Sequence, residues 1–328
     1  MKAIVATKYG SPDVLKLTDV AKPIPQNNEI LVKVYATTVT AGDARVRSFN
    51  VPRSLWLPAR LTLGLTKPKK SIPGMVLAGE VEAVGADVNE YKVGDAVYAY
   101  DITQLSAYAE YACVPVNSAL ALKPPTLTYE EVAALPFGGV TALYFLKKGN
   151  IQRGQQVLVY GASGSVGTFA VQLAKHFGAE VTAVCSTRNV ELVKSLGADT
   201  VIDYTREDFT KNGKTYDIIF DTVGKTPLPD TLKFLKDGGS YLQAVSGPAV
   251  LIQMLIASKR TGKTLIGGTA NPTKDDLDYL NKLVETGKLK PVIDRCYPLE
   301  QIIEAHRYVD TGHKKGDVVI TIAHNRKS

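Results

Sequence analysis

Cysteine is scarce in this sequence: three residues in 328, Cys113, Cys185 and Cys296, with no Cys-x-x-Cys spacing. A set this sparse and odd in number excludes a disulfide framework and a four-cysteine zinc lobe, and it favours a reducing, cytoplasmic setting. No run of about 18 uncharged apolar residues occurs, so we expect no transmembrane helix. The segment MKAIVATKYG lacks the unbroken apolar core of a signal peptide.

Charge of one sign is in modest excess. The net charge is +7, from 39 Lys and Arg against 32 Asp and Glu. Such an excess fits nucleic acid, an anionic membrane surface or a phosphorylated ligand, and equally the basic surface of a soluble enzyme. No RNA-stacking aromatic motif is present, so we expect no nucleic-acid partner. The composition, with 45% hydrophobic and 22% charged residues, is globular, and the length suggests about two domains.

The pattern of short strands changes along the chain. Up to about residue 125, short alternating runs separated by turn residues predict a β-rich barrel or sandwich. From 155 to about 270, near-continuous apolar strands alternate with helices, which predicts a doubly wound parallel sheet. The last strand, GDVVITI, resembles those of the first segment. We therefore predict an α/β protein with a first domain over 1–124, a second over 125–270, and a return to the first over 271–328.

One segment interrupts the strand pattern of the first domain. Residues 48–71 lack alternation and contain the only tryptophan, Trp56, and a run of basic residues that ends in Lys67, Lys69 and Lys70. We expect a long loop or a short helix here. It is either a binding loop that reaches a ligand or a solvated surface loop.

The strongest chemical signal is a glycine-rich turn. In VLVYGASGSVGTFAVQLAKHFGAE, an apolar strand leads through Gly161, Gly164 and Gly167 directly into an amphipathic helix, the context that a dinucleotide fingerprint requires. Glycines let the backbone approach a pyrophosphate, and the helix N-terminus offers N–H groups and a positive dipole end. The spacing departs from Gly-x-Gly-x-x-Gly, because Ala162 stands where the first glycine belongs. A tightly packed strand–turn–helix without a ligand is the alternative.

The end of the next strand distinguishes two cofactors. An NAD-binding unit usually places Asp or Glu there to hold the ribose 2′-hydroxyl. Here the strand ends in Ser186-Thr187-Arg188-Asn189, which contains no carboxylate. A hydroxyl and an arginine suit a 2′-phosphate, so NADPH is predicted as the cofactor; otherwise Arg188 is a solvated charge. Tyr204, at the end of the following strand, is predicted on the adenine side or in edge packing.

These segments together resemble a known family. IPGMVLAGEVEAVGADVNEYKVGDAVYA, GASGSVGTFAVQLAKHFGAEVTAVCSTRNVELVKSLGADTVIDY and HKKGDVVITI are similar to signatures of zinc-independent medium-chain dehydrogenases/reductases of the quinone oxidoreductase (zeta-crystallin-like) type. The chain resembles the branch with chloroplast envelope quinone oxidoreductase-like and mitochondrial reticulon-4-interacting-protein-like reductases. The resemblance implies a GroES-like catalytic domain, a Rossmann-type NADP-binding domain and, often, a homodimer.

The resemblance also implies a set of cofactor-binding residues, carried over position by position. They are Gly161, Ser163, Gly164, Ser165 and Val166 at the pyrophosphate; Ser186, Arg188 and Tyr204 at the adenosine 2′-phosphate end; Thr141, Val245, Ser246, Gly267 and Gly268 around the nicotinamide; and Lys315 at the cofactor phosphates.

The metal ligands of zinc-dependent relatives are missing. Zinc alcohol dehydrogenases of this fold carry a Cys after the second strand and Gly-His-Glu later, whereas this chain has Thr-Val-Thr-Ala-Gly-Asp at 38–43 and Gly-Met-Val at 74–76. We therefore predict no metal. The family's substrate-side Asn-Pro-x-Asp is changed to Thr40-Ala41-Gly42-Asp43, so we expect Thr40, Asp43 and Trp56 on the substrate side. Alternatively, Asp43 only fixes its loop.

These features favour reduction of an electron-poor acceptor. Without a Lewis acid or an evident proton relay, alcohol oxidation is hard to start, whereas quinones and α,β-unsaturated carbonyls accept hydride with mainly positioning and desolvation. We predict an NADPH-dependent reductase of a quinone or an enone, with its catalytic proton donor unassigned. Two alternatives stay open: an NADP-dependent enzyme acting on another carbonyl or alcohol, and an NADPH-liganded binding or sensor protein touching RNA or a membrane surface.

Overall fold

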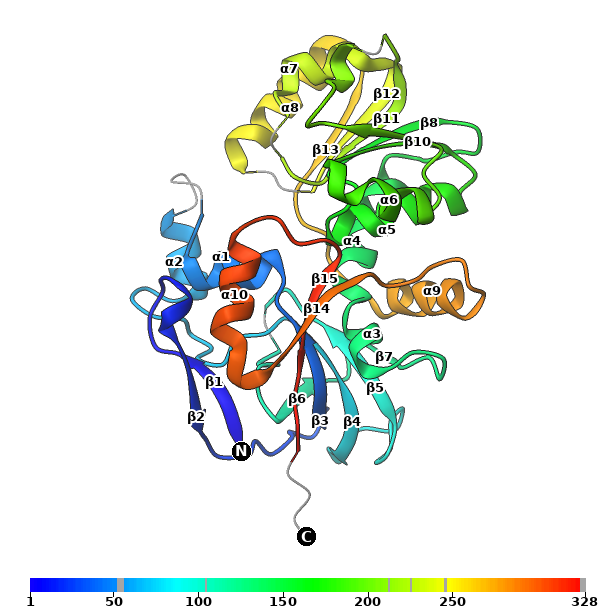
Figure 1. The fold of residues 1–328 in the computed structure, drawn as a ribbon. Coiled ribbons are helices and arrows are strands. Elements are labelled where there is room, and N and C mark those ends of the chain that lie inside the picture. The colour runs from blue at the N-terminus through cyan, green and yellow to red at the C-terminus, as the bar shows by residue number, and fades with distance from the viewer. Residues whose placement is uncertain (52–55, 104, 212, 225, 245–246, 325–328) are drawn as a thin grey trace. The chain divides into compact units, whose positions relative to one another are not determined.

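The chain packs into two compact units. The computed structural model describes residues 1–51, 56–103, 105–211, 213–224, 226–244 and 247–324 (Figure 1). Unit 1 comprises residues 1–137, 272–285 and 291–328, and unit 2 comprises residues 138–271 and 286–290. Unit 1 is therefore assembled from stretches that lie far apart in the sequence.

Unit 1 is built around a mainly antiparallel sheet. Among the described residues, seven strands form this sheet in the order β14–β15–β3–β4–β5–β7, with β6 also paired to β3, while β1 and β2 pair separately. The strands are β1 (Lys2–Ala6), β2 (Leu15–Asp19), β3 (Glu29–Thr38), β4 (Val76–Val84), β5 (Ala96–Tyr100), β6 (Tyr111–Pro115), β7 (Ala119–Leu122), β14 (Ile293–Pro298) and β15 (Asp317–Thr321). The helices are α1 (Ala41–Ser48), α2 (Trp56–Leu63), α3 (Tyr129–Ala133), α9 (Lys274–Glu285) and α10 (Ile302–Asp310).

Strand β3 is the centre of unit 1. Its apolar side chains Ile30, Val32 and Val34 are fully buried and join the hydrophobic core with residues of β4, β6 and β15. Strand β15 runs antiparallel to β3 and places Val319 opposite Thr38. The last strand of the sequence thus completes a sheet that begins near its start.

Unit 2 is built around a parallel sheet. Its described residues form six strands in the order β10–β9–β8–β11–β12–β13. They are β8 (Gln156–Tyr160), β9 (Glu180–Cys185), β10 (Thr200–Asp203), β11 (Tyr216–Asp221), β12 (Leu235–Gln243) and β13 (Thr264–Gly267). The helices are α5 (Ser165–His176), α6 (Val190–Ser195), α7 (Leu228–Thr231) and α8 (Pro248–Thr261), and α4 (Pro136–Lys148) begins at the unit boundary.

The predicted fold class, a β-rich domain with a doubly wound parallel sheet, is confirmed. Helix α8 was not predicted, because its leucines and isoleucines point largely into solvent and form no single buried stripe. Helix α7 is only four residues long, because a 3-10 turn follows it directly and β12 already begins at Leu235. No described helix has the length and apolarity needed to cross a bilayer.

Candidate active site

A tight glycine turn joins β8 to α5. Gly161 directly follows β8 with φ of +81°, a conformation that favours glycine. A Cβ at Gly161 would lie 2.4 Å from Cγ2 of Val223, and a Cβ at Gly167 would lie 2.2 Å from the carbonyl oxygen of Gly161. Both distances are far shorter than van der Waals contact. Glycine is therefore required at both positions, and α5 starts hard against the end of β8.

The N-terminus of α5 is left open by a third glycine. Gly164 is the N-cap, and no side chain caps the helix. A Cβ at Gly164 would have only the carbonyl oxygen of Gly161 near it, at 3.5 Å, so packing does not demand glycine here. Its absent side chain leaves the approach to the helix N–H groups clear, where the helix dipole favours an anion. The residues present therefore fit a pyrophosphate.

Helix α4 approaches the same N-terminus closely. A Cβ at Gly138 would lie 2.6 Å from the carbonyl oxygen of Ser165, so α4 and the first turn of α5 meet at backbone distance. Thr141 is buried and stands three residues after Gly138 on α4. Residues three apart share one face of a helix. Thr141 thus lies on the face of α4 that meets the glycine turn.

The end of β9 is tied to this turn by a residue that the sequence analysis missed. The buried side-chain amide of Asn189 donates to the hydroxyl oxygens of Ser163, at 2.9 Å, and Ser186, at 3.3 Å. One side chain thus holds two predicted cofactor residues from neighbouring loops, and Arg188 next to it is exposed. The sequence signal for this role was a polar residue, Asn189, at the start of a helix that packs on the sheet, because a buried side-chain amide requires hydrogen-bond partners.

A carboxylate lies near the end of β9 in the fold, although none follows it in sequence. Asp203 ends β10, opposite Cys185 in the sheet register. Its carboxylate accepts hydrogen bonds from the hydroxyls of Thr187, at 2.5 Å, and Thr205, at 2.7 Å. These bonds, with that from Thr187 the strongest cause, lower the pKa of Asp203. Asp203 therefore steadies the loop that carries Arg188, and the adjacent Tyr204 is exposed.

A third loop, also missed, packs on the first glycine. Asp221 is fully buried at the end of β11, where its carboxylate accepts from the N–H groups of Val223, at 2.9 Å, and Gly224, at 2.7 Å. It also accepts from the Thr226 hydroxyl at 2.5 Å. This holds Val223 against Gly161. The signal was Asp-Thr-Val-Gly after an apolar strand, since Asp readily bonds the backbone two residues on.

The remaining predicted cofactor residues are spread over both units. Gly267 ends β13, and Gly268 follows it with φ of +128°. Lys315 belongs to unit 1, where it precedes β15 and is exposed. Val245 and Ser246 lie outside the described residues.

On the predicted substrate side, Thr40 and Asp43 form a buried capping box at the start of α1. The Thr40 hydroxyl donates to Oδ2 of Asp43 at 2.6 Å and accepts from the Asp43 N–H at 3.0 Å. Burial raises the pKa of the Asp43 carboxyl to about 6, although the hydrogen bonds from Thr40 act in the opposite direction. Both side chains thus fix the N-terminus of α1. Trp56, the third residue of this set, begins α2 and is half exposed.

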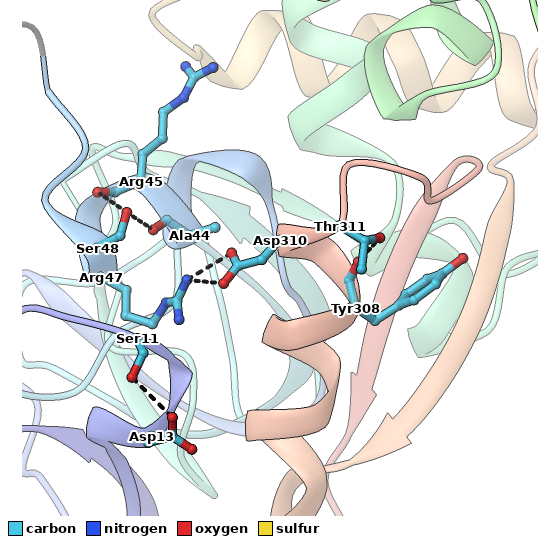
Figure 2. A network of polar contacts seen from close by, with 9 residues as sticks. All are labelled: Ser11, Asp13, Ala44, Arg45, Arg47, Ser48, Tyr308, Asp310 and Thr311. Carbon is cyan, nitrogen blue, oxygen red and sulfur yellow. Dashed lines mark hydrogen bonds and ion pairs between the residues drawn. The ribbon is translucent and has the colours of Figure 1, made fainter.

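A partly buried polar cluster joins α1 to α10, with Arg47 and His306 buried and Asp310 at the surface. Arg47 donates through Nη2 to both carboxylate oxygens of Asp310, at 2.8 and 2.6 Å (Figure 2). His306 is fully buried with its ring edge-on to Tyr108, and neither ring nitrogen has a hydrogen-bond partner among the described residues. Burial, together with the charge of Arg47, lowers the pKa of His306 to about 3. The imidazole is therefore neutral in the folded protein.

Within the part of the chain that the structure describes, no group of three or more His, Cys, Asp or Glu side chains is arranged to bind a metal ion. That the protein works without a metal stays a prediction.

Comparison with known proteins places this architecture. A GroES-like β-rich unit with a Rossmann-type sheet defines the medium-chain dehydrogenase/reductase class. Residues 26–125 match the alcohol dehydrogenase GroES-like domain, and residues 196–320 match the zinc-binding dehydrogenase family. The solved structure of a quinone oxidoreductase from Coxiella burnetii has a TM-score of 0.88 and 31% identity, covering 98% of this chain and 99% of that one.

Curated relatives narrow the class. The chain is 36% identical to the 2-methylene-furan-3-one reductase of Solanum lycopersicum and 33% identical to an NADPH-dependent alkenal/one oxidoreductase, chloroplastic, of Arabidopsis thaliana. Each match covers 98% of this chain and 79% of the relative. The chain belongs to the quinone oxidoreductase family of medium-chain dehydrogenases/reductases, and the resemblance drawn from its motifs is confirmed.

We expect Gly167→Ala and Gly164→Ala to differ sharply in stability. The new methyl of Gly167→Ala meets the Gly161 carbonyl oxygen, so we expect a loss of about 1–3 kcal/mol in the free energy of unfolding. The methyl of Gly164→Ala makes an ordinary contact, so its loss should stay below about 0.5 kcal/mol. Urea unfolding of both variants measures this. Equal losses would contradict the geometry of the turn.

We expect His306→Phe to reduce the acid sensitivity of folding. The pKa of His306 is lower in the folded than in the unfolded state, so its contribution to stability is present above pH 6.5 and is lost as the pH falls toward 3. Between pH 7.5 and 5.0, the wild type should lose about 2 kcal/mol more than the variant. Urea unfolding at both pH values tests this. Val309→Ala, a truncation in the same helix, should destabilise equally at both.

Proposed function

We propose that this protein transfers a hydride from NADPH to a quinone or an α,β-unsaturated carbonyl. The observation that carries the proposal is the open N-terminus of α5, with Ser186 and the exposed Arg188 tied beside it through Asn189. This arrangement offers backbone N–H groups to a pyrophosphate and a cation with a hydroxyl to a 2′-phosphate. The names of the tomato and Arabidopsis relatives, a furanone reductase and an NADPH-dependent alkenal/one oxidoreductase, support the same reaction class.

The proposed cofactor contacts follow from these positions. The turn Gly161–Val166 holds the pyrophosphate, Arg188 pairs with the 2′-phosphate, and Tyr204 offers its exposed ring to the adenine. The other residues of the set are proposed from the family resemblance alone: Thr141, Val245, Ser246, Gly267 and Gly268 near the nicotinamide, and Lys315 at the phosphates.

The chain's own residues supply orientation more than chemistry. NADPH, when bound, supplies the hydride. The Thr40 hydroxyl already donates to Asp43 and accepts from its N–H, so we propose that this pair shapes the substrate side by fixing α1. Trp56 offers an apolar ring for acceptor binding. Because the Thr40 hydroxyl is engaged within the chain, we propose water as the source of the proton.

We further propose a homodimer in a reducing, cytoplasmic compartment. Strand β13 is an edge of the unit 2 sheet, and an edge strand offers unpaired backbone groups to a second copy. Next to it, α8 exposes Leu251, Ile252 and Leu255, which support association. Three free cysteines without a disulfide partner suit a reducing compartment.

We expect NADPH to stabilise the protein more than NADH does. Arg188→Ala removes a charge-assisted contact with the 2′-phosphate, so it should weaken NADPH binding at least tenfold and leave NADH binding nearly unchanged. Thermal shift and calorimetric titration with both cofactors measure this. Arg153→Ala, an exposed arginine before β8, is the matched control. A larger stabilisation by NADH would overturn the cofactor assignment.

We expect NADPH oxidation in the presence of a quinone or a short-chain enone, without added metal and unaffected by a chelator. Saturated aldehydes should support no turnover, because their carbonyls need polarisation by an acid or a metal. Loss of NADPH absorbance with the three acceptor panels measures this. Turnover of saturated carbonyls alone would favour a different dehydrogenase. NADPH binding without turnover on any panel would favour a binding protein.

A further inference from the structure

The positive charge of this protein is concentrated in one stretch of sequence. Between Asp43 and Glu80 there are seven basic residues and no acidic one, and this surplus equals the net charge of the whole chain, +7. The stretch supplies α1, α2 and the loop that leads to β4. Only Arg47 of α1 is buried in an ion pair with Asp310, whereas Figure 2 shows Arg45 pointing away from that pair.

The same stretch exposes large apolar side chains. On α2 and just after it, the exposed fractions are 49% for Trp56, 58% for Leu57, 58% for Leu61 and 63% for Leu65. The exposed lysines Lys67, Lys69 and Lys70 follow immediately. We call these seven residues the basic apolar patch. Exposed apolar side chains gathered in this way mark an interaction surface more often than single exposed leucines do.

The patch is a folded surface with defined contacts. The guanidinium of Arg60 lies 3.9 Å from the ring centroid of Phe49, 4.7 Å from that of Tyr9 and 5.1 Å from that of Trp56. Arg60 also donates to the carbonyl oxygen of Leu65 at 2.8 Å. The loop is thereby held against the end of α2, and the leucines and the tryptophan are kept at the surface.

A second pair of bonds fixes Lys69 beside the leucines. The backbone N–H of Lys69 donates to the carbonyl oxygen of Leu63 at 2.8 Å, and its ammonium donates to the carbonyl oxygen of Leu61 at 2.7 Å. Cationic and apolar groups are thus held side by side at one end of unit 1, where Figure 1 shows α2 and α1 as neighbours.

We propose that the basic apolar patch docks this protein on a membrane surface that contains anionic lipids. Tryptophan and leucine side chains partition into the boundary between headgroups and acyl chains, and adjacent lysines attract acidic headgroups. Neither part alone accounts for the surface: a polyanion such as RNA leaves the leucines unburied, and an apolar partner leaves the charge uncompensated. The proposed contact is with the membrane surface, since no helix in the described ranges is long and apolar enough to cross a bilayer.

The single tryptophan of the chain lies within the patch, so its fluorescence reports docking directly. We expect vesicles of phosphatidylglycerol and phosphatidylcholine to shift the Trp56 emission to shorter wavelength and to protect it from acrylamide. Vesicles of phosphatidylcholine alone should produce neither effect. Co-sedimentation should show the same preference and weaken as NaCl rises from about 50 mM to about 500 mM, because salt screens surface charge.

Matched variants separate the two parts of the patch. We expect the triple variant Lys67→Gln, Lys69→Gln, Lys70→Gln to lower vesicle partitioning about 100-fold, since each lysine near an anionic surface contributes about fivefold. The control changes three exposed lysines elsewhere, Lys16, Lys92 and Lys194, to Gln, and it should bind like the wild type.

A second pair of variants tests the apolar part without changing charge. Leu61→Ser with Leu65→Ser should lower partitioning at least tenfold, because two apolar side chains no longer enter the interface. Ile24→Ser with Val93→Ser, at similarly exposed positions, should not. Circular dichroism checks that all variants fold, and the lysine variants remain informative if the leucine pair does not.

Several outcomes would overturn the proposal. These are equal binding to both kinds of vesicle, an unchanged emission with anionic vesicles, or equal loss in patch and control variants. Salt-sensitive binding of a nucleic-acid oligomer in preference to anionic vesicles would also overturn it, as would a patch variant that changes only the oligomeric mass in analytical ultracentrifugation.

Discussion

The carbonyl oxygen of Gly161 and the backbone of Gly167 leave no room for a Cβ between them, and the cofactor half of this protein is arranged around that contact. This contact sets the distance between α5 and the end of β8, and it thereby sets the position of the N-terminus of α5. Asn189 donates a hydrogen bond to Ser163 within this turn. Val223, held by Asp221, packs on the other side of Gly161. The loops that follow β8, β9 and β11 therefore pack together at a place where glycines leave room for close backbone contact.

In unit 1, by contrast, buried polar side chains and their partners link the helices to the rest of the unit. Asp43 accepts hydrogen bonds from Thr40, Arg47 is held by Asp310, and His306 is buried as a neutral ring beside Tyr108. Each such group costs free energy unless it is paired or uncharged. The imidazole of His306 meets that requirement by staying neutral. The carboxyl of Asp43, whose pKa burial raises to about 6, meets it through the hydrogen bonds that it accepts from Thr40. Ordinary apolar packing around β3 supplies the rest of the core.

The fold class could be predicted from the sequence because its signals are local. Strand alternation, apolar runs and a glycine turn between a strand and a helix each span only a few residues. Asn189 and Asp221 could not be found in this way, since their roles depend on partners brought close by the parallel sheet. Helix α8 was missed because its apolar side chains are exposed and give no buried stripe. The capping box of Thr40 and Asp43 has a short-range pattern, but its burial is set by the tertiary fold.

The distribution of charge changes the interpretation of the basic composition. Once the seven basic residues between Asp43 and Glu80 are set aside, 32 basic residues face 32 acidic ones in the rest of the chain. A generally basic surface would spread the surplus over both units, and it would not place exposed leucines beside it. The surplus belongs to one stretch of sequence, and within that stretch Arg60 and Lys69 bond the same segment that exposes Leu61 and Leu65. The attraction between exposed lysines and an anionic surface extends over about one Debye length. Because the lysines lie next to the exposed leucines, this attraction orients the protein so that the leucines are the first apolar side chains to touch the surface.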